Sequence, residues 1–231
     1  MKLATARARL ERLAAVLLAR VRPVRAKRLG ELAFWRERHA VEGRLVNHHY
    51  AALFTDHFAL PADHFRGLEI LDIGCGPRGS LEWAEGATVR IGLDPLALEY
   101  RAFGTTAHEM DYVAASSDRL PFASSSLDMV SAFNALDHVE DLEGTLAEVA
   151  RVLRPGGDFL LLVDVNHEPT VLEPLNLSWE LPLRDRFREV RVRHYERHAD
   201  GTLATLRKAR PFDHDDPRPR PGMLSAHLTV T

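Results

Sequence analysis

The sequence predicts an α/β fold in which a mostly parallel sheet is covered by helices on both faces. Short apolar runs alternate with helical stretches from Leu68 onward, and a glycine-rich loop follows the first run. Alternation of this kind indicates a parallel sheet. Five runs have the pattern of strands: LEILDI from Leu68, VRIGLD from Val89, MDYVAA from Met110, LDMVSAFN from Leu127 and DFLLLVDV from Asp158.

Helical patterns lie between and after these strands. Residues 96–103 form one such segment, and residues 142–153 form another with a single apolar face. The RPGG sequence at 154–157 supplies the proline and glycine that end a helix. After the fifth strand we expect a helix around residues 171–181, interrupted by Pro169, Pro174 and Pro182.

Two β-like stretches follow, at residues 188–197 and 222–230, with the proline-rich DHDDPRPRPG between them. We expect them to close the sheet as an antiparallel pair. Upstream, residues 31–58 predict two helices, at 32–39 and 46–58, which could form a lid. The expected organisation is therefore an N-terminal helix over 1–28, a helical cap over 29–66 and one α/β domain over 67–231.

The N-terminal segment differs in charge from the rest of the chain. Residues 1–28 contain nine Lys and Arg and one Glu, a net +8, whereas the whole chain of 231 residues carries −3 and the remainder therefore −11. An acidic body argues against nucleic-acid binding. The segment predicts a helix up to Pro23 with one apolar stripe, formed by Leu3, Leu10, Leu13, Val16 and Leu17. It either packs on its own domain or lies on an anionic membrane surface.

The composition indicates a cytoplasmic protein. Cys75 is the only cysteine, which excludes an intramolecular disulfide and a cysteine-rich zinc site. The apolar run from Leu13 is too short to span a bilayer, and Arg20 and Arg22 follow where a signal peptide needs small residues. The alternative is a peripheral location at the inner face of a membrane, with residues 1–28 making the contact.

The glycine loop, DIGCGPRG from Asp72, permits two functions. Gly74, Gly76 and Gly79 fit the GxGxxG pattern of dinucleotide-binding enzymes. Asp94, near the end of the second strand, suits either cofactor because a carboxylate accepts hydrogen bonds from both ribose hydroxyls. Asp72 separates the two, since a carboxylate there favours a cationic, amino-acid-bearing ligand over a pyrophosphate.

Five motifs in order resemble those of class I S-adenosylmethionine-dependent methyltransferases, especially methyltransferase type 11. They are LDIGCGPRG at 71–79, GLDP at 92–95, DRLPF at 118–122, LDMVSAFNALDHVED at 127–141 and EVARVLRPGG at 148–157. The resemblance implies a three-layer Rossmann-like fold with a seven-stranded sheet. It also implies S-adenosylmethionine as the cofactor and S-adenosylhomocysteine as its product.

The resemblance further implies a set of cofactor-binding residues. Asp72, Gly74 and Gly76, with Cys75 between the glycines, hold the methionine part. Asp94 and Pro95 lie at the ribose, although Asp94 could instead only cap the following helix. Leu96 packs on the adenine, and the remaining contacts come from Ser116, Ser117 and Asn134. The sequence departs from the family at Arg78, which occupies the third glycine position, and at Ser116, where an acid often meets the adenine amino group.

Three residues are candidates for the chemistry, because ligands bind beyond the carboxyl ends of the strands. Asp137 and His138 follow the fourth strand, and His167 follows the fifth. Either histidine could remove a proton from a hydroxyl or amine acceptor, with Asp137 orienting it. The alternative is a structural role, with Asp137 capping the next helix.

The predicted cap is rich in histidine, at positions 39, 48, 49, 57 and 64, with Tyr50 among them. Adjacent His48 and His49 point to different helix faces and no carboxylate completes a site, so we expect no metal. These side chains either line an acceptor pocket, with Tyr50 reaching the cofactor, or form a solvated helix face. The function predicted is methyl transfer to a small-molecule, glycan or lipid-intermediate acceptor. The alternatives are a cofactor-binding scaffold without turnover and an NAD(P)-dependent oxidoreductase.

Overall fold

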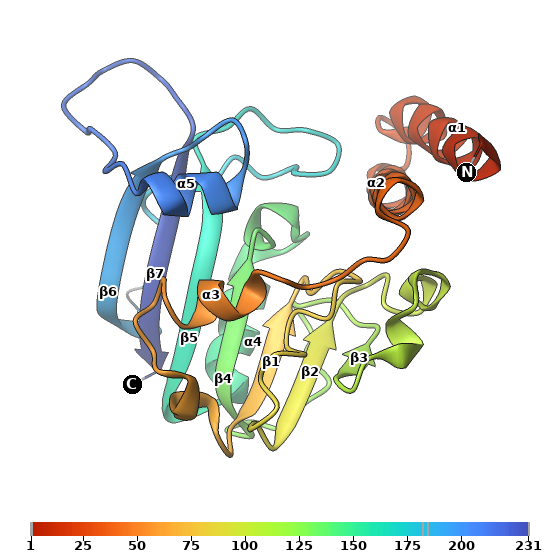
Figure 1. Cartoon of the computed structure of the whole chain (residues 1–231). Coiled ribbons are helices and arrows are strands. Elements are labelled where there is room, and N and C mark those ends of the chain that lie inside the picture. The colour runs from red at the N-terminus through yellow and green to blue at the C-terminus, as the bar shows by residue number, and fades with distance from the viewer. Residues whose placement is uncertain (1, 182, 184, 231) are drawn as a thin grey trace.

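The computed structural model contains a central sheet of seven strands (Figure 1). It describes residues 2–181, 183 and 185–230, and the side chains of residues 6–181, 183 and 185–230. The strand order is β3-β2-β1-β4-β5-β7-β6. The strands are β1 (Glu69–Ile73), β2 (Val89–Leu93), β3 (Asp111–Val113), β4 (Leu127–Phe133), β5 (Leu153–Val165), β6 (Phe187–Glu196) and β7 (Gly222–Val230). All seven predicted strands are confirmed.

The pairing of the strands fixes where the functional loops meet. β1 to β5 pair in parallel, whereas β7 lies antiparallel between β5 and β6. β1 sits between β2 and β4, so the chain order reverses at this point and the loops after these strands meet at one edge of the sheet. Open α/β sheets bind ligands at such an edge.

The apolar runs form strands because both faces of the sheet are covered. Leu160, Leu161 and Leu162 of β5 are each fully buried although they alternate between faces. One core lies between the sheet and α4 (Leu142–Val152), whose Leu146 and Val149 are also fully buried. Asp141 accepts a hydrogen bond from the Gly144 backbone N–H at 2.9 Å and caps the start of α4.

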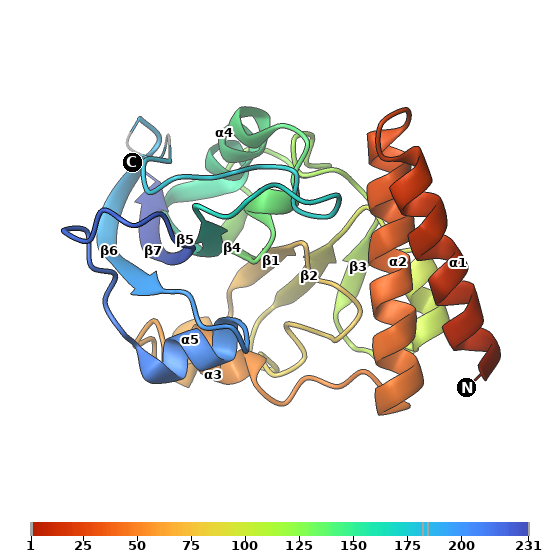
Figure 2. The same cartoon turned by 90° about the horizontal axis from the view of Figure 1, so that it is seen from above.

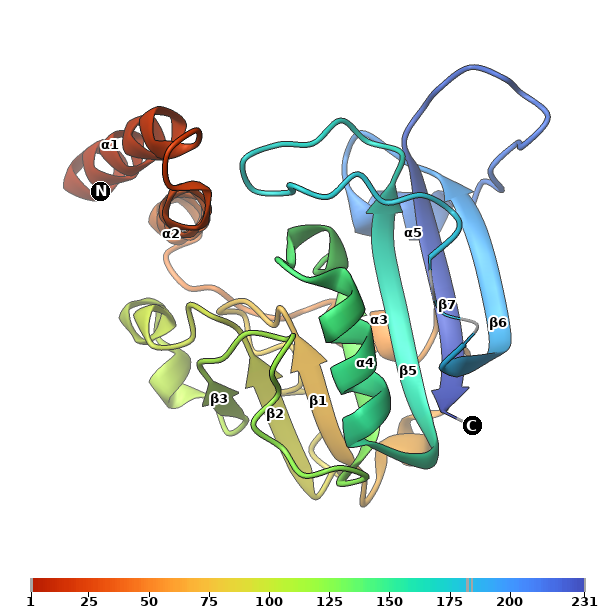
Figure 3. The same cartoon turned by 180° about the vertical axis from the view of Figure 1, so that it is seen from behind.

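The opposite core lies beneath two short helices, α3 (Tyr50–Phe54) and α5 (Thr202–Lys208). Figure 3 shows α4 on the face turned away from them, so the domain has the three layers expected. Four further segments are short 3₁₀ turns, at Ala62–Phe65, Glu99–Phe103, Thr105–Ala107 and Leu136–His138. The helix predicted for residues 96–103 is thus only a 3₁₀ turn, and the one predicted for 46–58 is reduced to α3.

Among the described residues, no helix forms directly after the glycine loop, and the helix expected around residues 171–181 is also absent. The glycine loop leads into consecutive tight turns, with Glu82 N–H bonded to Gly79 C=O and Ala84 N–H to Leu81 C=O, because only residues 80–88 separate it from β2. The helix predicted around 171–181 is an irregular segment. Pro169 and Pro174 supply no N–H for a helical ladder. Pro182 lies outside the described residues.

The N-terminal residues form a helical hairpin, α1 (Lys2–Leu18) and α2 (Pro23–Glu42), at the carboxyl edge of the sheet (Figure 2). α1 ends before Pro23, which instead occupies the first turn of α2, where its missing N–H costs nothing. α2 therefore runs across the boundary placed between residues 28 and 29. No helix among the described residues is long and apolar enough to cross a bilayer.

Candidate active site

The glycine loop after β1 has a backbone that only glycine adopts easily. Gly74 and Gly76 have φ values of 70° and 57°. A Cβ at Gly74 would lie 2.5 Å from the Ala135 Cβ, and one at Gly76 would lie 2.9 Å from the Trp35 ring. The two glycines thus bring the loop against the segment after β4 and against α2.

Two buried carboxylates flank this loop, and they are the residues that the sequence predicted. Asp72, 3% exposed at the end of β1, accepts a hydrogen bond from the Ser131 hydroxyl at 2.5 Å. Asp94, 8% exposed after β2, accepts from the Leu96 N–H at 2.9 Å and from the Gly76 N–H at 3.4 Å. Asp94 therefore does cap the turn after it, and the same bonds fix its carboxylate beside the glycine loop.

Burial raises the pKa of both carboxyl groups to about 6, against an ordinary 3.8. Hydrogen bonds from Ser131 to Asp72 and from Leu96 to Asp94 lower the pKa and offset part of that effect. Neither carboxylate is in an ion pair within the described chain. Two buried carboxylates that are in no ion pair fit a ligand that carries positive charge and hydroxyl groups, as S-adenosylmethionine does.

α2 closes the site from above. Trp35 lies on Gly76, Arg28 donates to the Pro95 carbonyl at 2.8 Å, and Lys27 donates to the His138 carbonyl. Arg78 stacks on Trp35, its guanidinium carbon 5.7 Å from the ring centroid. These contacts join α2 to the loops after all three central strands.

Arg78 also holds the far end of the helix. It pairs with Glu42 at 2.7 Å and donates to the Val46 carbonyl at 3.1 Å. Arg78, which occupies the third glycine position, therefore connects the glycine loop to the end of α2.

The second half of the site surrounds His138. Its Nδ1 lies 2.8 Å from the Glu31 Oε1 of α2, and its Nε2 lies 4.0 Å from Glu173 Oε1. Burial lowers the pKa of His138, but the Glu31 hydrogen bond and the charge of Asp137 outweigh that effect, so the pKa is raised. Sequence reasoning missed Glu31 because only the folding of α2 onto the sheet brings it to His138.

Asp137 and His167 approach each other across the ends of β4 and β5. Asp137 is 2% exposed, its Oδ2 is 3.7 Å from His167 Nε2, and burial raises its pKa. Within the described chain, Asp137 Oδ1 and His167 Nε2 have no hydrogen-bond partner. Asp137 does not cap α4, since Asp141 does. The three candidate residues therefore meet in one place.

Comparisons with known proteins find similarity to methyltransferases. Residues 71–161 match the family model described as "Methyltransferase domain". O-methyltransferase rstn1 of Aspergillus nomiae is 35% identical over 99 residues, which are 39% of this chain and 44% of that protein. Sterol 24-C-methyltransferase erg6 of Aspergillus fumigatus is 31% identical over 101 residues, 40% of this chain and 27% of that protein.

Residues 71–161 are a class I S-adenosylmethionine-dependent methyltransferase domain. The chain spans less than half the length of these curated relatives. A methyltransferase structure from Mesorhizobium loti has a TM-score of 0.57 at 23% identity and covers 77% of this chain and 97% of its own. The (4+2)-cyclase SpnF has a TM-score of 0.52 at 19% identity, covering 73% of this chain and 78% of its own. Both likenesses concern the fold.

The remaining cofactor candidates of the methyltransferase domain take different positions. Leu96 is buried beneath α2 beside Leu45 and Tyr100. Asn134 ends β4 with φ 51° and donates to the Thr202 hydroxyl of α5 at 2.6 Å.

The two serines predicted at the adenine also differ from each other. Ser116 is exposed and donates to Asp118. Ser117 is buried against the Thr145 hydroxyl at 2.8 Å, so its hydroxyl has a structural partner. Cys75 is 2% exposed, and burial raises its pKa, so it takes part in the loop as packing.

The cap histidines do not share a pocket. His57 bonds to the Ser225 hydroxyl of β7 at 2.7 Å, and His64 lies 3.2 Å from Asp158 at the opposite end of β5. His49 stacks on Tyr50, whose pKa is raised by burial and by the charge of Asp72. Tyr50 is thus one cap residue that approaches the cofactor half of the site, as Trp35 is another.

One group in the described chain has the composition of a metal site. Ligand atoms of Asp137, His138 and Glu173 lie within 4.8 Å of one another. Two ligands about 2.1 Å from one zinc ion are at most about 4.2 Å apart, so this group would have to contract to hold one. The three side chains could form hydrogen bonds to a methyl acceptor without moving closer together.

Proposed function

We propose that the protein transfers the methyl group of S-adenosylmethionine to a small-molecule, glycan or lipid-intermediate acceptor. The observation that carries this proposal is the pair of buried carboxylates, Asp72 and Asp94, at the glycine loop. Neither ionised carboxylate is in an ion pair within the described chain, and a bound sulfonium and ammonium would place positive charge beside them. A dinucleotide, with its anionic pyrophosphate, would be repelled by Asp72.

Bound S-adenosylmethionine supplies a methyl group already activated by the positive sulfur. Most of the acceleration then comes from orienting the acceptor in line and excluding water, which is the task of the contacts between α2 and the loops. Glu31 holds the His138 Nδ1–H, leaving Nε2 to accept a proton from an acceptor hydroxyl. Nε2 would take the hydroxyl proton as the acceptor oxygen bonds to the methyl carbon and the carbon–sulfur bond breaks, which would leave neutral S-adenosylhomocysteine.

The charges around His138 bear on the kind of acceptor. Glu31, Asp137 and Glu173 place three carboxyl groups near it, and Lys27 lies among them with a pKa lowered by burial. An anionic acceptor group would be repelled there, so we propose a neutral hydroxyl or an amine as the methylated group. Curated relatives include O-methyltransferases and sterol C-methyltransferases, whose names describe those proteins.

A second candidate is a cofactor-binding protein that performs no methyl transfer. The fold resembles that of a (4+2)-cyclase, and one fold can host different reactions, so this second candidate is retained. The two candidates differ in product. Incubation with labelled S-adenosylmethionine and a broad acceptor panel supports the methyltransferase if label appears in an acceptor. Tight cofactor binding with no labelled product favours the second candidate.

Isothermal titration with S-adenosylmethionine, S-adenosylhomocysteine and NADH tests the cofactor itself. Asp94→Ala should lower the affinity for S-adenosylmethionine by at least about fivefold, roughly 1 kcal/mol, because charge-assisted hydrogen bonds are lost. Asp94→Asn keeps an acceptor for the Leu96 N–H and separates the loss of charge from the loss of the cap. Asp111→Ala, at an exposed position that begins β3, is the control. Unchanged affinity in both Asp94 variants, or tight binding of NADH alone, contradicts the proposal.

A further inference from the structure

The outer face of α1 is apolar and has no partner among the described residues. Leu10, Leu13, Val16 and Leu17 are 57–71% exposed. They occupy one side of the helix, as the sequence spacing predicts. Val21 and Val24 continue the exposed apolar surface into the turn before α2 and its first residues. Together these six residues are the α1 stripe, and Leu3, expected to belong to it, has a side chain outside the described part.

The hairpin does not need the α1 stripe for its own stability. α1 packs on α2 through small side chains on its other face, Ala8 and Ala15, which are 0% and 4% exposed. Ala26, Gly30 and Ala33 form the matching surface of α2. Ion pairs of Arg12 with Glu37 and of Arg36 with Glu11 fasten the two helices. A helix that turns its small residues inward and its large apolar residues outward presents a binding surface.

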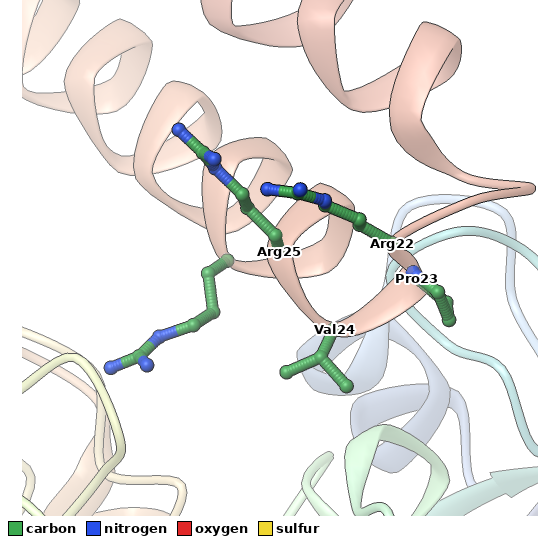
Figure 4. Close-up of a pocket in the computed structure, with 5 residues that line it drawn as sticks. Arg22, Pro23, Val24 and Arg25 are labelled. Carbon is green, nitrogen blue, oxygen red and sulfur yellow. The ribbon is translucent and has the colours of Figure 1, made fainter.

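Positive charge accompanies the α1 stripe. Arg9, Arg20, Arg22 and Arg25 form no ion pair within the described part of the chain. Arg22, Pro23, Val24 and Arg25, with Arg28, line a hollow where α2 begins, and Figure 4 shows the Arg22 and Arg25 side chains extending from it in similar directions. The first turn of α2 contains no acidic residue.

We propose that the α1 stripe and the arginines beside it dock the protein on an anionic phospholipid surface. The apolar side chains enter the interface between headgroups and acyl chains, and the arginines bind lipid phosphates and carboxylates. Charge complementarity decides the occupant, because residues 1–28 carry a net +8 while the rest of the chain carries −11. The acidic body is repelled by the same surface, which leaves the hairpin as the docking element.

The hairpin lies at the edge of the sheet where the reaction is proposed, and α1 is its outermost element (Figure 2). Docking through α1 therefore leaves α2 between the lipid surface and the glycine loop. The inference does not rest on methyl transfer, since vesicle binding requires neither cofactor nor acceptor.

Flotation of the full-length protein with vesicles tests the proposal. Vesicles of equal amounts of phosphatidylcholine and phosphatidylserine should carry the protein upward, whereas pure phosphatidylcholine should carry much less. Val16→Glu should lower partitioning about tenfold, because it removes an apolar contact and adds a repelled charge. The matched control is Val190→Glu, the same change at an exposed valine of β6.

The arginines are tested separately. Arg22→Gln with Arg25→Gln should lower partitioning about tenfold at low salt, and added salt should narrow the gap between this variant and the parent. Circular dichroism melting confirms that each variant is folded, which is expected because the substituted side chains are exposed. The proposal is overturned if the parent protein does not float with anionic vesicles, or if V16E and V190E partition alike.

Discussion

Replacing Asp72 with asparagine separates the stability of the ligand-free fold from its affinity for the cofactor. Each unit by which a folded pKa exceeds its unfolded value is worth about 1.36 kcal/mol. Burial raises the pKa of Asp72 from 3.8 to about 6, so the ionised carboxylate costs the ligand-free fold about 3 kcal/mol at pH 8. Because the folded pKa is the higher one, this cost is absent below pH 3.8, grows up to pH 6 and is constant above it.

Asp72→Asn should therefore increase the free energy of unfolding by about 3 kcal/mol at pH 8 and leave it nearly unchanged at pH 4. The amide oxygen of asparagine can still accept the Ser131 hydrogen bond, so the packing is retained. Affinity for S-adenosylmethionine should fall at the same time, because the cationic ligand loses its carboxylate. Stability and binding are then opposed at this residue.

Urea unfolding followed by circular dichroism at pH 4 and pH 8, with titration calorimetry at pH 8, measures both effects. Asp111→Asn, an exposed position at the start of β3, should change neither. The reasoning is refuted if D72N is no more stable than the parent at pH 8. It is equally refuted if the stability gain is the same at both pH values, or if cofactor affinity is unchanged.

Two further variants test α2. Glu31→Gln removes a contact that raises the pKa of His138, so the acidic limb of the pH profile of kcat/KM should move to lower pH. If the acidic limb does not move, His138 is excluded as the base. Glu42→Gln breaks the pair with Arg78 and should speed deuterium exchange in the last turns of α2 with little change in melting temperature. Glu109→Gln breaks an exposed pair elsewhere and serves as its control.

The sequence was sufficient for the elements that local pattern determines. Most strands contain the apolar runs that predicted them, whereas β6 mixes charged with apolar residues. The positions of Asp72 and Asp94 follow from their motifs at the ends of two apolar runs. The apolar face of α4 likewise depends on residues close in sequence, although the residue that caps this helix is Asp141 and not the expected Asp137. The place of Asp72 and Asp94 beside the glycine loop was therefore predictable, because both residues lie at the ends of strands that the apolar runs identify.

Features that depend on distant packing were not predictable. Glu31 reaches His138 only because α2 folds over the sheet, and Trp35 reaches Gly76 for the same reason. The periodicity of α1 identified its apolar stripe but not the direction in which it points, since alanines on the other face pack equally well against Gly30 and its neighbours. Around residues 171–181, apolar spacing suggested a helix, and the missing proline N–H groups prevented it.

The antiparallel position of β7 has a consequence for synthesis of the chain. A nascent chain that ends at residue 221 contains β5 and β6 but not the strand that joins them, since both pair with β7. Until β7 emerges, one edge of β5 is an open template for another chain, and the buried leucines of that strand lie exposed beside it. The sheet is therefore expected to complete its folding only after β7 has been made and has paired with both strands.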